Sequence, residues 1–291
     1  MIKILTKSQF KAKITGNKIV SIVIPTRNSA TLLNQCLLHI KSQSYSKIET
    51  IIVDGGSTDN AKEITGKYNC KFFTYDPKLK KGLFDAPHKI NYGVSKAIGE
   101  YIYWVDADME LTKNVVRDAV LMCEKEAGAV IVPEESFGKG IWARAKQLER
   151  RCYWGDDTVE SPRFLKASVW KAIGGFDLSL GGGGNDWDLY MKIREHGDKV
   201  ERIKSLVMHN EGNLKLTKLI KKRFMYGREA LNYISKRPKA GFVSFFPFRK
   251  AFFKNWRLFV PRPIDTIAFI VMRFAEYTAG FLGIIYAKIM K

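Results

Sequence analysis

The sequence predicts an α/β fold built on a doubly wound, mostly parallel sheet and followed by a basic helical region. Short apolar runs rich in β-branched residues alternate with segments of helical periodicity in the first 212 residues. This alternation is typical of parallel sheets covered by helices. The composition then changes, because residues 211–291 carry 17 Lys or Arg against four acidic residues. The sequence therefore predicts a domain at 1–212 and a basic helical region at 213–291.

The first half of the predicted domain repeats a strand, loop and helix unit. An apolar strand at 19–24 ends at Pro25 and precedes a helical pattern. The unit recurs after ETIIVD, which ends at Asp54. A strand near CKFFTYD precedes a helix predicted at about 91–98, and EYIYWV then runs into Asp106. Because doubly wound sheets bind ligands at the carboxyl ends of their strands, we expect a site where these strands end.

The second half of the predicted domain continues with the apolar strand AGAVIVPE and an amphipathic helix around 139–151. Four consecutive glycines at 181–184 exclude regular structure locally and predict a loop or a close approach to a ligand. A further helix is expected to begin near Asn185 and end at Gly197.

The C-terminal region ends in a largely apolar segment at 264–287, which is long enough as a helix to span a bilayer core. On a helical wheel Asp265, Arg273 and Glu276 fall in one sector, together with two glycines. This stripe is expected to face protein while the remaining surface faces lipid. The alternative is a core helix of a soluble C-terminal domain.

The carboxylates Asp106 and Asp108 directly follow a strand in the stretch YIYWVDADME. Residues two apart in a strand point to the same face, so the two side chains can converge on one point. Paired oxygen ligands are what Mn²⁺ or Mg²⁺ requires. The alternative is a pair of solvated turn aspartates.

Four ordered motifs give these aspartates a context: IVSIVIPTRNSATLL, IETIIVDGGSTDN, GEYIYWVDADM and GGFDLSLGGGGNDWDLYMKIREHG. Together they resemble the family 2 glycosyltransferases of GT-A fold, over residues 19–212. That fold combines a Rossmann-like nucleotide-binding half with an acceptor half. The tail that begins MHNEGNLKL resembles membrane-associated members that act on lipid-linked or polysaccharide acceptors, part of which have a cellulose-synthase-like core.

The resemblance implies where the donor binds. Pro25, Thr26 and Asn28 are expected to border the nucleotide base, and Asp54 to accept a hydrogen bond from it. The alternative for Asp54 is a turn residue that binds its own backbone. Lys89 is expected at the phosphates, where many members have an arginine one position later.

The resemblance also implies the metal ligands. Asp106 is expected near the ribose and the ion, with Asp108 as a direct ligand of Mn²⁺ or Mg²⁺ holding the diphosphate. His209 stands where some relatives supply a third ligand, and a structural role is its alternative.

On the acceptor side, the family usually has a Glu-Asp pair, and this chain has Asn185 and Asp186. Asp186 is expected to be the general base that deprotonates the attacking hydroxyl. The competing interpretation is local: Asn185 caps the helix, and Asp186 and Asp188 are favoured by the helix dipole. For Asp188 we favour the structural role.

Three arginines have two interpretations each. Arg223 and Arg228 are expected either to meet the negative charge of the leaving diphosphate or to contact lipid headgroups. Arg163 is expected to contact an anionic acceptor or to lie on the surface.

The sequence thus predicts an inverting transferase that moves a hexose from a UDP- or GDP-linked sugar to a lipid-linked or glycan acceptor. Its expected place is the cell membrane, with the catalytic domain on the cytoplasmic side, because the basic excess suits an anionic surface and the four cysteines form no CxxC pair. No nucleic acid partner is expected. The competing classes are a basic nucleic-acid-binding protein and a nucleotidyltransferase on a similar sheet.

Overall fold

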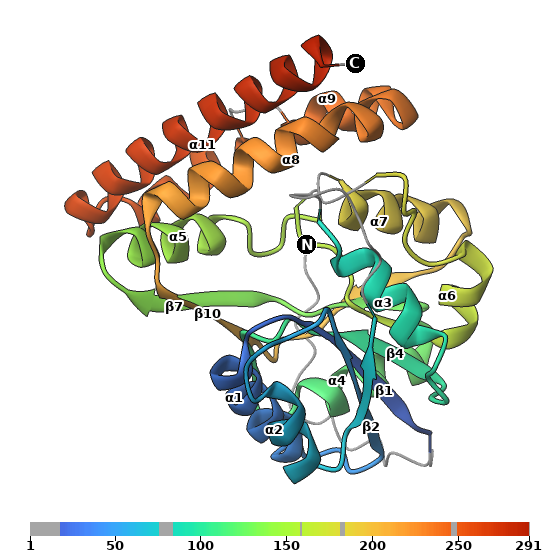
Figure 1. Ribbon diagram of the computed structural model, residues 1–291. Coiled ribbons are helices and arrows are strands. Elements are labelled where there is room, and N and C mark those ends of the chain that lie inside the picture. The colour runs from blue at the N-terminus through green and yellow to red at the C-terminus, as the bar shows by residue number, and fades with distance from the viewer. Residues whose placement is uncertain (1–17, 76–83, 158, 181–183, 246–248, 291) are drawn as a thin grey trace.

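The computed structural model describes residues 18–75, 84–157, 159–180, 184–245 and 249–290. Three of the four consecutive glycines, 181–183, lie outside these residues. The described chain forms a helix-covered sheet with a long helical pair above it (Figure 1).

The main sheet has seven strands in the order β3-β2-β1-β4-β8-β6-β9. These strands are β1 (Val20–Thr26), β2 (Ile48–Asp54), β3 (Lys71–Thr74), β4 (Tyr101–Trp104), β6 (Ala129–Ile131), β8 (Phe164–Lys166) and β9 (Val200–Arg202). The first four pair in parallel, whereas β8 runs antiparallel to both β4 and β6. The prediction of an α/β fold on a mostly parallel sheet is therefore confirmed.

A second sheet of three strands has the order β5-β10-β7. Its members are β5 (Met109–Leu111), β7 (Glu134–Lys139) and β10 (Val207–Asn213). Strand β10 pairs antiparallel with β5, in a register that sets His209 opposite Met109. This pairing brings a strand from the end of the predicted domain to the turn that follows β4.

Helices cover both faces of the main sheet because its central strands are apolar on both faces. In β1, Val20, Ile22 and Ile24 belong to a core cluster with α1 (Ala30–Lys41), α2 (Ala61–Lys67) and α4 (Val115–Lys125). Val23, with its side chain on the opposite face, belongs to a separate cluster. On that face lie α3 (Ala86–Val94), α6 (Ala167–Ile173) and α7 (Asn185–Glu195).

Helix α3 begins and ends earlier than the predicted range of about 91–98. Pro87 stands in its first turn, where proline is compatible with a helix because no amide is needed there. Gly93 lies so close to the sheet that a Cβ would come 2.4 Å from Val23. Glycine at position 93 therefore lets the end of α3 pack directly on β1.

The C-terminal helices are α8 (Leu216–Lys236), α9 (Pro238–Phe245), α10 (Lys250–Lys254), the short 3₁₀ helix η2 (Trp256–Leu258) and α11 (Pro263–Ile289). Of these, α10 and α11 pack against α5 (Ile141–Cys152), which lies below α8 and α11 in Figure 1. A separate core cluster joins Leu148 of α5 to Leu219 of α8 and Met272 of α11. The helical region therefore shares a core with α5.

Candidate active site

The ends of β1 and β2 carry the residues expected at the nucleotide base. The register sets Thr26 beside Asp54. Both are buried, and the Thr26 hydroxyl has no hydrogen-bond partner among the described residues. Pro25 is half-buried next to Thr26. These three residues lie where parallel strands end, as the sequence predicts for a ligand site.

Asp54 is held by the turn that follows it. One carboxylate oxygen accepts hydrogen bonds from the amides of Gly56 at 2.9 Å and Ser57 at 2.8 Å. The other accepts one from the Ser57 hydroxyl. The local turn offered as the alternative for Asp54 is therefore present, and a contact with a base stays a prediction.

Asn28 joins the first loop to the same turn. Its φ of 48° is in the left-handed region, which asparagine tolerates better than most residues. Its side-chain oxygen accepts a hydrogen bond from the Thr58 amide at 2.8 Å, and its own amide donates to the Ser57 hydroxyl at 2.8 Å. The loops after β1 and β2 thus form one connected rim.

The side chain of Lys89, on α3, extends to the rim that these two loops form. Its side chain is 3% exposed, with Nζ 2.8 Å from the Asp85 carboxylate and 3.3 Å from the Thr26 carbonyl oxygen. A Cβ at Gly55 would come 2.5 Å from Nζ, so a larger residue there would require the end of the lysine side chain to move. The structure therefore places Lys89 under the loop that follows Asp54.

Asp106 and Asp108 lie in a tight turn after β4, and the strand does not continue through them. The turn is closed by a hydrogen bond from the Met109 amide to the Asp106 carbonyl at 3.0 Å. Asp106 accepts a hydrogen bond from Arg163 at 3.2 Å, whereas Asp108 lies 3.4 Å from Nε2 of His209. Each aspartate thus faces its own cation. The expected alignment on one strand face is wrong, because the chain turns into β5.

Glu134, at the start of β7, connects these two pairs. One of its oxygens accepts a hydrogen bond from Nε of Arg163 at 3.0 Å. The other lies 3.1 Å from Arg150 and 3.5 Å from Nδ1 of His209. Burial opposes ionisation of Glu134, but Arg150 and Arg163 hold its pKa well below the ordinary value. The sequence analysis missed this residue, although an acidic residue directly after the apolar run AVIVP was a signal for it.

Two carboxylates flank the imidazole of His209. Burial lowers the pKa of its imidazole, but Asp108 and Glu134 outweigh burial and raise the pKa to about 10. An imidazole must lose its proton before it can bind a metal ion. Nε2 of His209 lies 3.4 Å from the Asp108 carboxylate, and metal ligation by His209 stays a prediction.

The residues of this turn fit a divalent ion only in part. Oδ1 of Asp108 is buried without a hydrogen-bond partner among the described residues, so it is an oxygen ligand with no competing contact. The described ranges contain no preassembled group of three His, Cys, Asp or Glu side chains that could hold an ion. Asp108 therefore suits an ion whose remaining ligands come from phosphates and water.

Asp186 lies in the first turn of α7, beside a small recess that Glu134, Arg150 and Arg163 also line. Its side chain is exposed, yet surrounding protein atoms crowd it, and this partial desolvation raises the pKa of the carboxyl. Arg163 opposes the increase, while the charge of Asp106 adds to it. A raised pKa makes Asp186 a better proton acceptor than an ordinary aspartate.

The helix cap at α7 differs from the local alternative. The N-cap is Gly184, and Asn185 is the first helical residue, 5% exposed and without a side-chain cap. The capping role for Asn185 is therefore wrong. Asp188 is 1% exposed and binds Lys236 and Arg237 of α8 at 2.9 Å each, which agrees with its structural role.

The arginines of α8 have different surroundings. Arg223 pairs with Glu276 of α11 at 3.3 Å. The Arg228 guanidinium lies 5.3 Å from the centre of the Tyr286 ring. The sequence analysis missed Lys222, whose pKa is raised chiefly by Tyr226, with Asp106 adding to the increase. Lys222 also lowers the pKa of Asp108, so its charge acts on the aspartate turn.

Known proteins place this site in a family. A model described as glycosyl transferase family 2 matches residues 21–179. The chain therefore belongs to the family 2 glycosyltransferases.

Two relatives illustrate the sequence similarity. The glycosyltransferase GlyG of Streptococcus pneumoniae is 34% identical over 116 residues, which are 40% of this chain and 38% of that protein. The chain thus matches less than half of GlyG. A PGL/p-HBAD biosynthesis glycosyltransferase of Mycobacterium tuberculosis is 28% identical over 218 residues, 70% of this chain and 82% of that one.

Solved structures extend the similarity to the whole fold. A mannosyltransferase from Pyrobaculum calidifontis, in complex with GDP-Man and Mn²⁺, has a TM-score of 0.66 at 17% identity, over 94% of this chain and 89% of its own. TarS of S. aureus has a TM-score of 0.53 at 17% identity, over 91% of this chain and 53% of its own. At these identities the similarity shows a shared fold.

Proposed function

We propose that the protein is an inverting, metal-dependent glycosyltransferase that moves a hexose from a UDP- or GDP-linked sugar to a lipid-linked or glycan acceptor. One observation carries the proposal: in a family 2 chain, Asp106 and Asp108 stand at the end of β4, next to the rim formed by Asn28 and Asp54. The mannosyltransferase of the same fold, bound to GDP-Man and Mn²⁺, supports this class of donor and ion.

The donor is proposed to bind along the strand ends. The base lies at the rim of Pro25, Asn28 and Asp54, with Lys89 beneath it for the phosphates. Asp108 would hold the ion, with Asp106 beside it, and a bound ion would supply positive charge for the diphosphate.

The acceptor is proposed to approach from the recess beside Asp186. The Asp186 carboxylate takes the proton of the attacking hydroxyl, whose oxygen bonds to the anomeric carbon from the side opposite the diphosphate. The configuration at that carbon is thereby inverted. Arg163 fixes Asp106 and Glu134 relative to each other. Lys222, on α8, meets the negative charge of the leaving diphosphate.

The C-terminal helices are proposed to hold the enzyme on the cytoplasmic face of a membrane. By length and composition α11 is able to cross a bilayer, as are many core helices of soluble proteins. Midway along α11, however, Arg273 pairs with Glu149 of α5 at 2.7 Å. Since a crossing helix would draw α5 into the bilayer, we place α11 in the plane of the membrane surface.

The apolar side of α11 supports this orientation. Large apolar side chains that are at least 59% exposed follow one another along the helix: Ile264, Ile267, Ile270, Phe274, Phe281 and Ile289. Arg257 and Arg262 stand shortly before the helix, and Lys288 near its end. Apolar area flanked by cations is typical of binding to anionic lipid surfaces.

A panel experiment tests the activity. The full chain is incubated with Mn²⁺, membranes and a set of nucleotide sugars, and the release of UDP or GDP is measured. We expect release with one donor class only, and only when both metal and acceptor are present. If none of the donors releases its nucleotide, in any combination of ion and membrane, the proposed transferase activity is wrong.

A further inference from the structure

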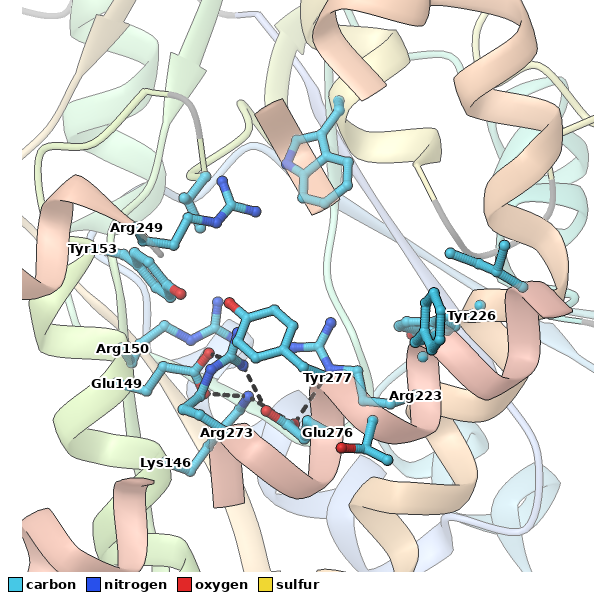
Figure 2. A pocket seen from close by; sticks show the side chains of 17 residues that line it. Lys146, Glu149, Arg150, Tyr153, Arg223, Tyr226, Arg249, Arg273, Glu276 and Tyr277 are labelled. Atoms are coloured by element: carbon cyan, nitrogen blue, oxygen red, sulfur yellow. Dashed lines mark hydrogen bonds and ion pairs between the residues drawn. The ribbon is translucent and has the colours of Figure 1, made fainter. Parts of the chain in front are cut away.

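A cavity of about 520 Å³ lies between α5, α8, α11 and the start of α7 (Figure 2). It adjoins the recess of Asp186, because Arg150 and Val159 line both spaces. A molecule bound in the cavity can therefore extend toward the proposed general base. The proposed reaction assigns no role to this cavity.

Cations dominate the lining of this cavity. The charged lining residues are the cations Lys146, Arg150, Arg223, Arg249 and Arg273 and the acids Glu149 and Glu276. In Figure 2 they converge on one space from α5, α8, α11 and the N-cap of α10. The lining thus has five positive charges and two negative ones.

The two acids are shared among three of the cations. Glu149 lies 2.7 Å from Arg273 and 2.6 Å from Lys146, and Glu276 lies 2.5 Å from Arg273 and 3.3 Å from Arg223. Burial opposes ionisation of Glu149, but Arg273 and Lys146 hold its pKa below the ordinary value. Both acids are thus neutralised. Arg150 pairs instead with Glu134 at 3.1 Å, so the three cations Lys146, Arg223 and Arg273 outnumber their two acids by one positive charge in a partly enclosed space. A bound anion compensates such an excess.

Two lining groups also lack a hydrogen-bond partner among the described residues. They are the buried hydroxyl of Tyr277 and Nε of Arg273. Both are donors, and a buried donor without an acceptor costs free energy. A group with several acceptor oxygens, such as a phosphate, satisfies both donors and supplies the missing negative charge.

The same cavity opens onto apolar surface. Phe281 and Ile284 of α11 line it, together with Trp187 and Tyr226. The Phe281 side chain is 63% exposed and belongs to the apolar side of α11. A continuous path thus leads from the charged interior to the surface that we place against the membrane.

We propose that this cavity binds the phosphate-bearing head of an amphiphilic acceptor, whose apolar chain leaves over Phe281 onto the apolar side of α11. The inference rests on the proposed transferase function and names its acceptor class. A neutral glycan would leave the positive charge uncompensated. A free phosphate would leave the apolar exit unused.

Three probes, tested for binding to the purified full chain, separate the contribution of the phosphate from that of the apolar chain. Farnesyl phosphate, farnesol and inorganic phosphate are titrated by calorimetry without nucleotide sugar, below the concentration at which farnesyl phosphate aggregates. We expect farnesyl phosphate to bind at least about tenfold more tightly than either of the others. Equal binding of farnesol, or equal binding of inorganic phosphate, would overturn the proposal.

Variants place the binding in the cavity. Arg223→Gln removes one lining charge and leaves Glu276 with two cations, so we expect binding to weaken about tenfold. Arg144→Gln is the matched control, because Arg144 pairs with Asp265 outside the cavity. Thr278→Trp fills the cavity from an exposed helical position and keeps every ion pair. Unchanged binding by Thr278→Trp, or equal weakening by the two arginine variants, would contradict the assignment.

Asp108→Asn separates this inference from the proposed function. It removes the proposed metal ligand and leaves the cavity intact, so we expect lost nucleotide release with unchanged binding of farnesyl phosphate. For the wild-type chain, turnover of donor without binding of farnesyl phosphate would refute the acceptor class alone. Binding of farnesyl phosphate by the wild-type chain without any release of nucleotide would refute the activity alone.

Discussion

At the scale of single residues, Glu134 organises the charged site. It contacts Arg150, Arg163 and His209, which come from three different elements or loops. Through these contacts the positions of Asp106 and Asp108 depend on one buried carboxylate. Charge-assisted networks of this kind fix side-chain geometry before a substrate binds.

Asp108→Asn is expected to reduce nucleotide release by at least about 100-fold, because an amide is a weak ligand for a hard cation. The change also removes the acid that pairs with His209. The measurement is released UDP or GDP at saturating Mn²⁺. Asp118→Asn is the control, since Asp118 pairs with Arg117 on α4, outside the site. Full turnover by the Asp108 variant would show that this carboxylate holds no ion.

Asp177 gives the molecule an acid-dependent contact between α8 and the chain before α7. Burial opposes ionisation, but Lys236 at 2.6 Å and Ser179 outweigh it and lower the pKa from 3.8 to about 2. Because the folded pKa is the lower one, this contact stabilises the fold above the unfolded pKa and is lost as pH falls from 3.8 toward about 2.

Asp177→Asn is therefore expected to destabilise the protein near neutral pH and to make little difference near pH 2. The urea midpoints of the two proteins, measured across this range, check it. The gap between them is expected to stay constant above about pH 5. A gap that remains unchanged down to the acid limit would mean that the ion pair contributes nothing.

At the scale of elements, the crossing of α8 and α11 depends on small residues. A Cβ at Gly283 would come 2.2 Å from the Phe224 carbonyl oxygen, which belongs to the backbone and cannot rotate away. A Cβ at Gly280 would have Arg223 O as its nearest neighbour, at 3.8 Å. An added methyl group would thus clash with the backbone of α8 at Gly283 but make only an ordinary contact at Gly280.

Gly283→Ala is expected to lower the unfolding temperature by several degrees, because the helices must separate to accept the methyl group. Gly280→Ala is the matched control. It is expected to be neutral or to stabilise by about 0.5–1 kcal/mol, since alanine is the better helix former. Thermal unfolding followed by circular dichroism measures both. Equal effects of the two changes would contradict this account of the helix contact.

The buried stripe of α11 agrees with its expected orientation. Arg273 is 8% exposed and Glu276 2%, and both face α5 and α8. The sequence placed these charges on the protein side because a charged group is expensive in lipid. Because the same ion pairs join α11 to α5 and α8, α11 is packed as part of the folded protein.

At the scale of the whole molecule, part of the positive charge of the C-terminal region is balanced by ion pairs within the protein. Several C-terminal cations are paired within the protein, among them Arg223, Lys236, Arg237 and Arg273. Aromatic residues of this region also pack on one another, as Phe252 and Phe259 do on Phe269. Membership of the glycosyltransferase family favours the enzyme over the nucleic-acid-binding alternative.

Phe274→Glu is expected to reduce flotation with anionic vesicles without lowering the unfolding temperature, because the Phe274 side chain is 75% exposed. The matched control is Ile98→Glu, since Ile98 is 66% exposed at the loop before β4. Point changes are preferable to deletion of α11, which would uncover the core around Met272. Equal flotation of the two variants would show that the apolar side of α11 does not bind the membrane.

The sequence alone determined the α/β class, the strand-end position of Asp54 and Asp106, and the polar stripe of α11. Each follows from local rules: apolar runs form strands, ligands meet strand ends, and periodicity assigns helix faces. It also identified the family from four ordered motifs, now confirmed over residues 21–179.

The tertiary structure decided what lies beside these residues. Only the pairing of β10 with β5 brings His209 to Asp108, and only the fold joins Glu134 to Arg163. The cavity between α5, α8 and α11 likewise has no local signal, because its lining comes from segments more than 120 residues apart. Contacts between distant segments depend on packing of the whole chain, and local periodicity carries no record of them.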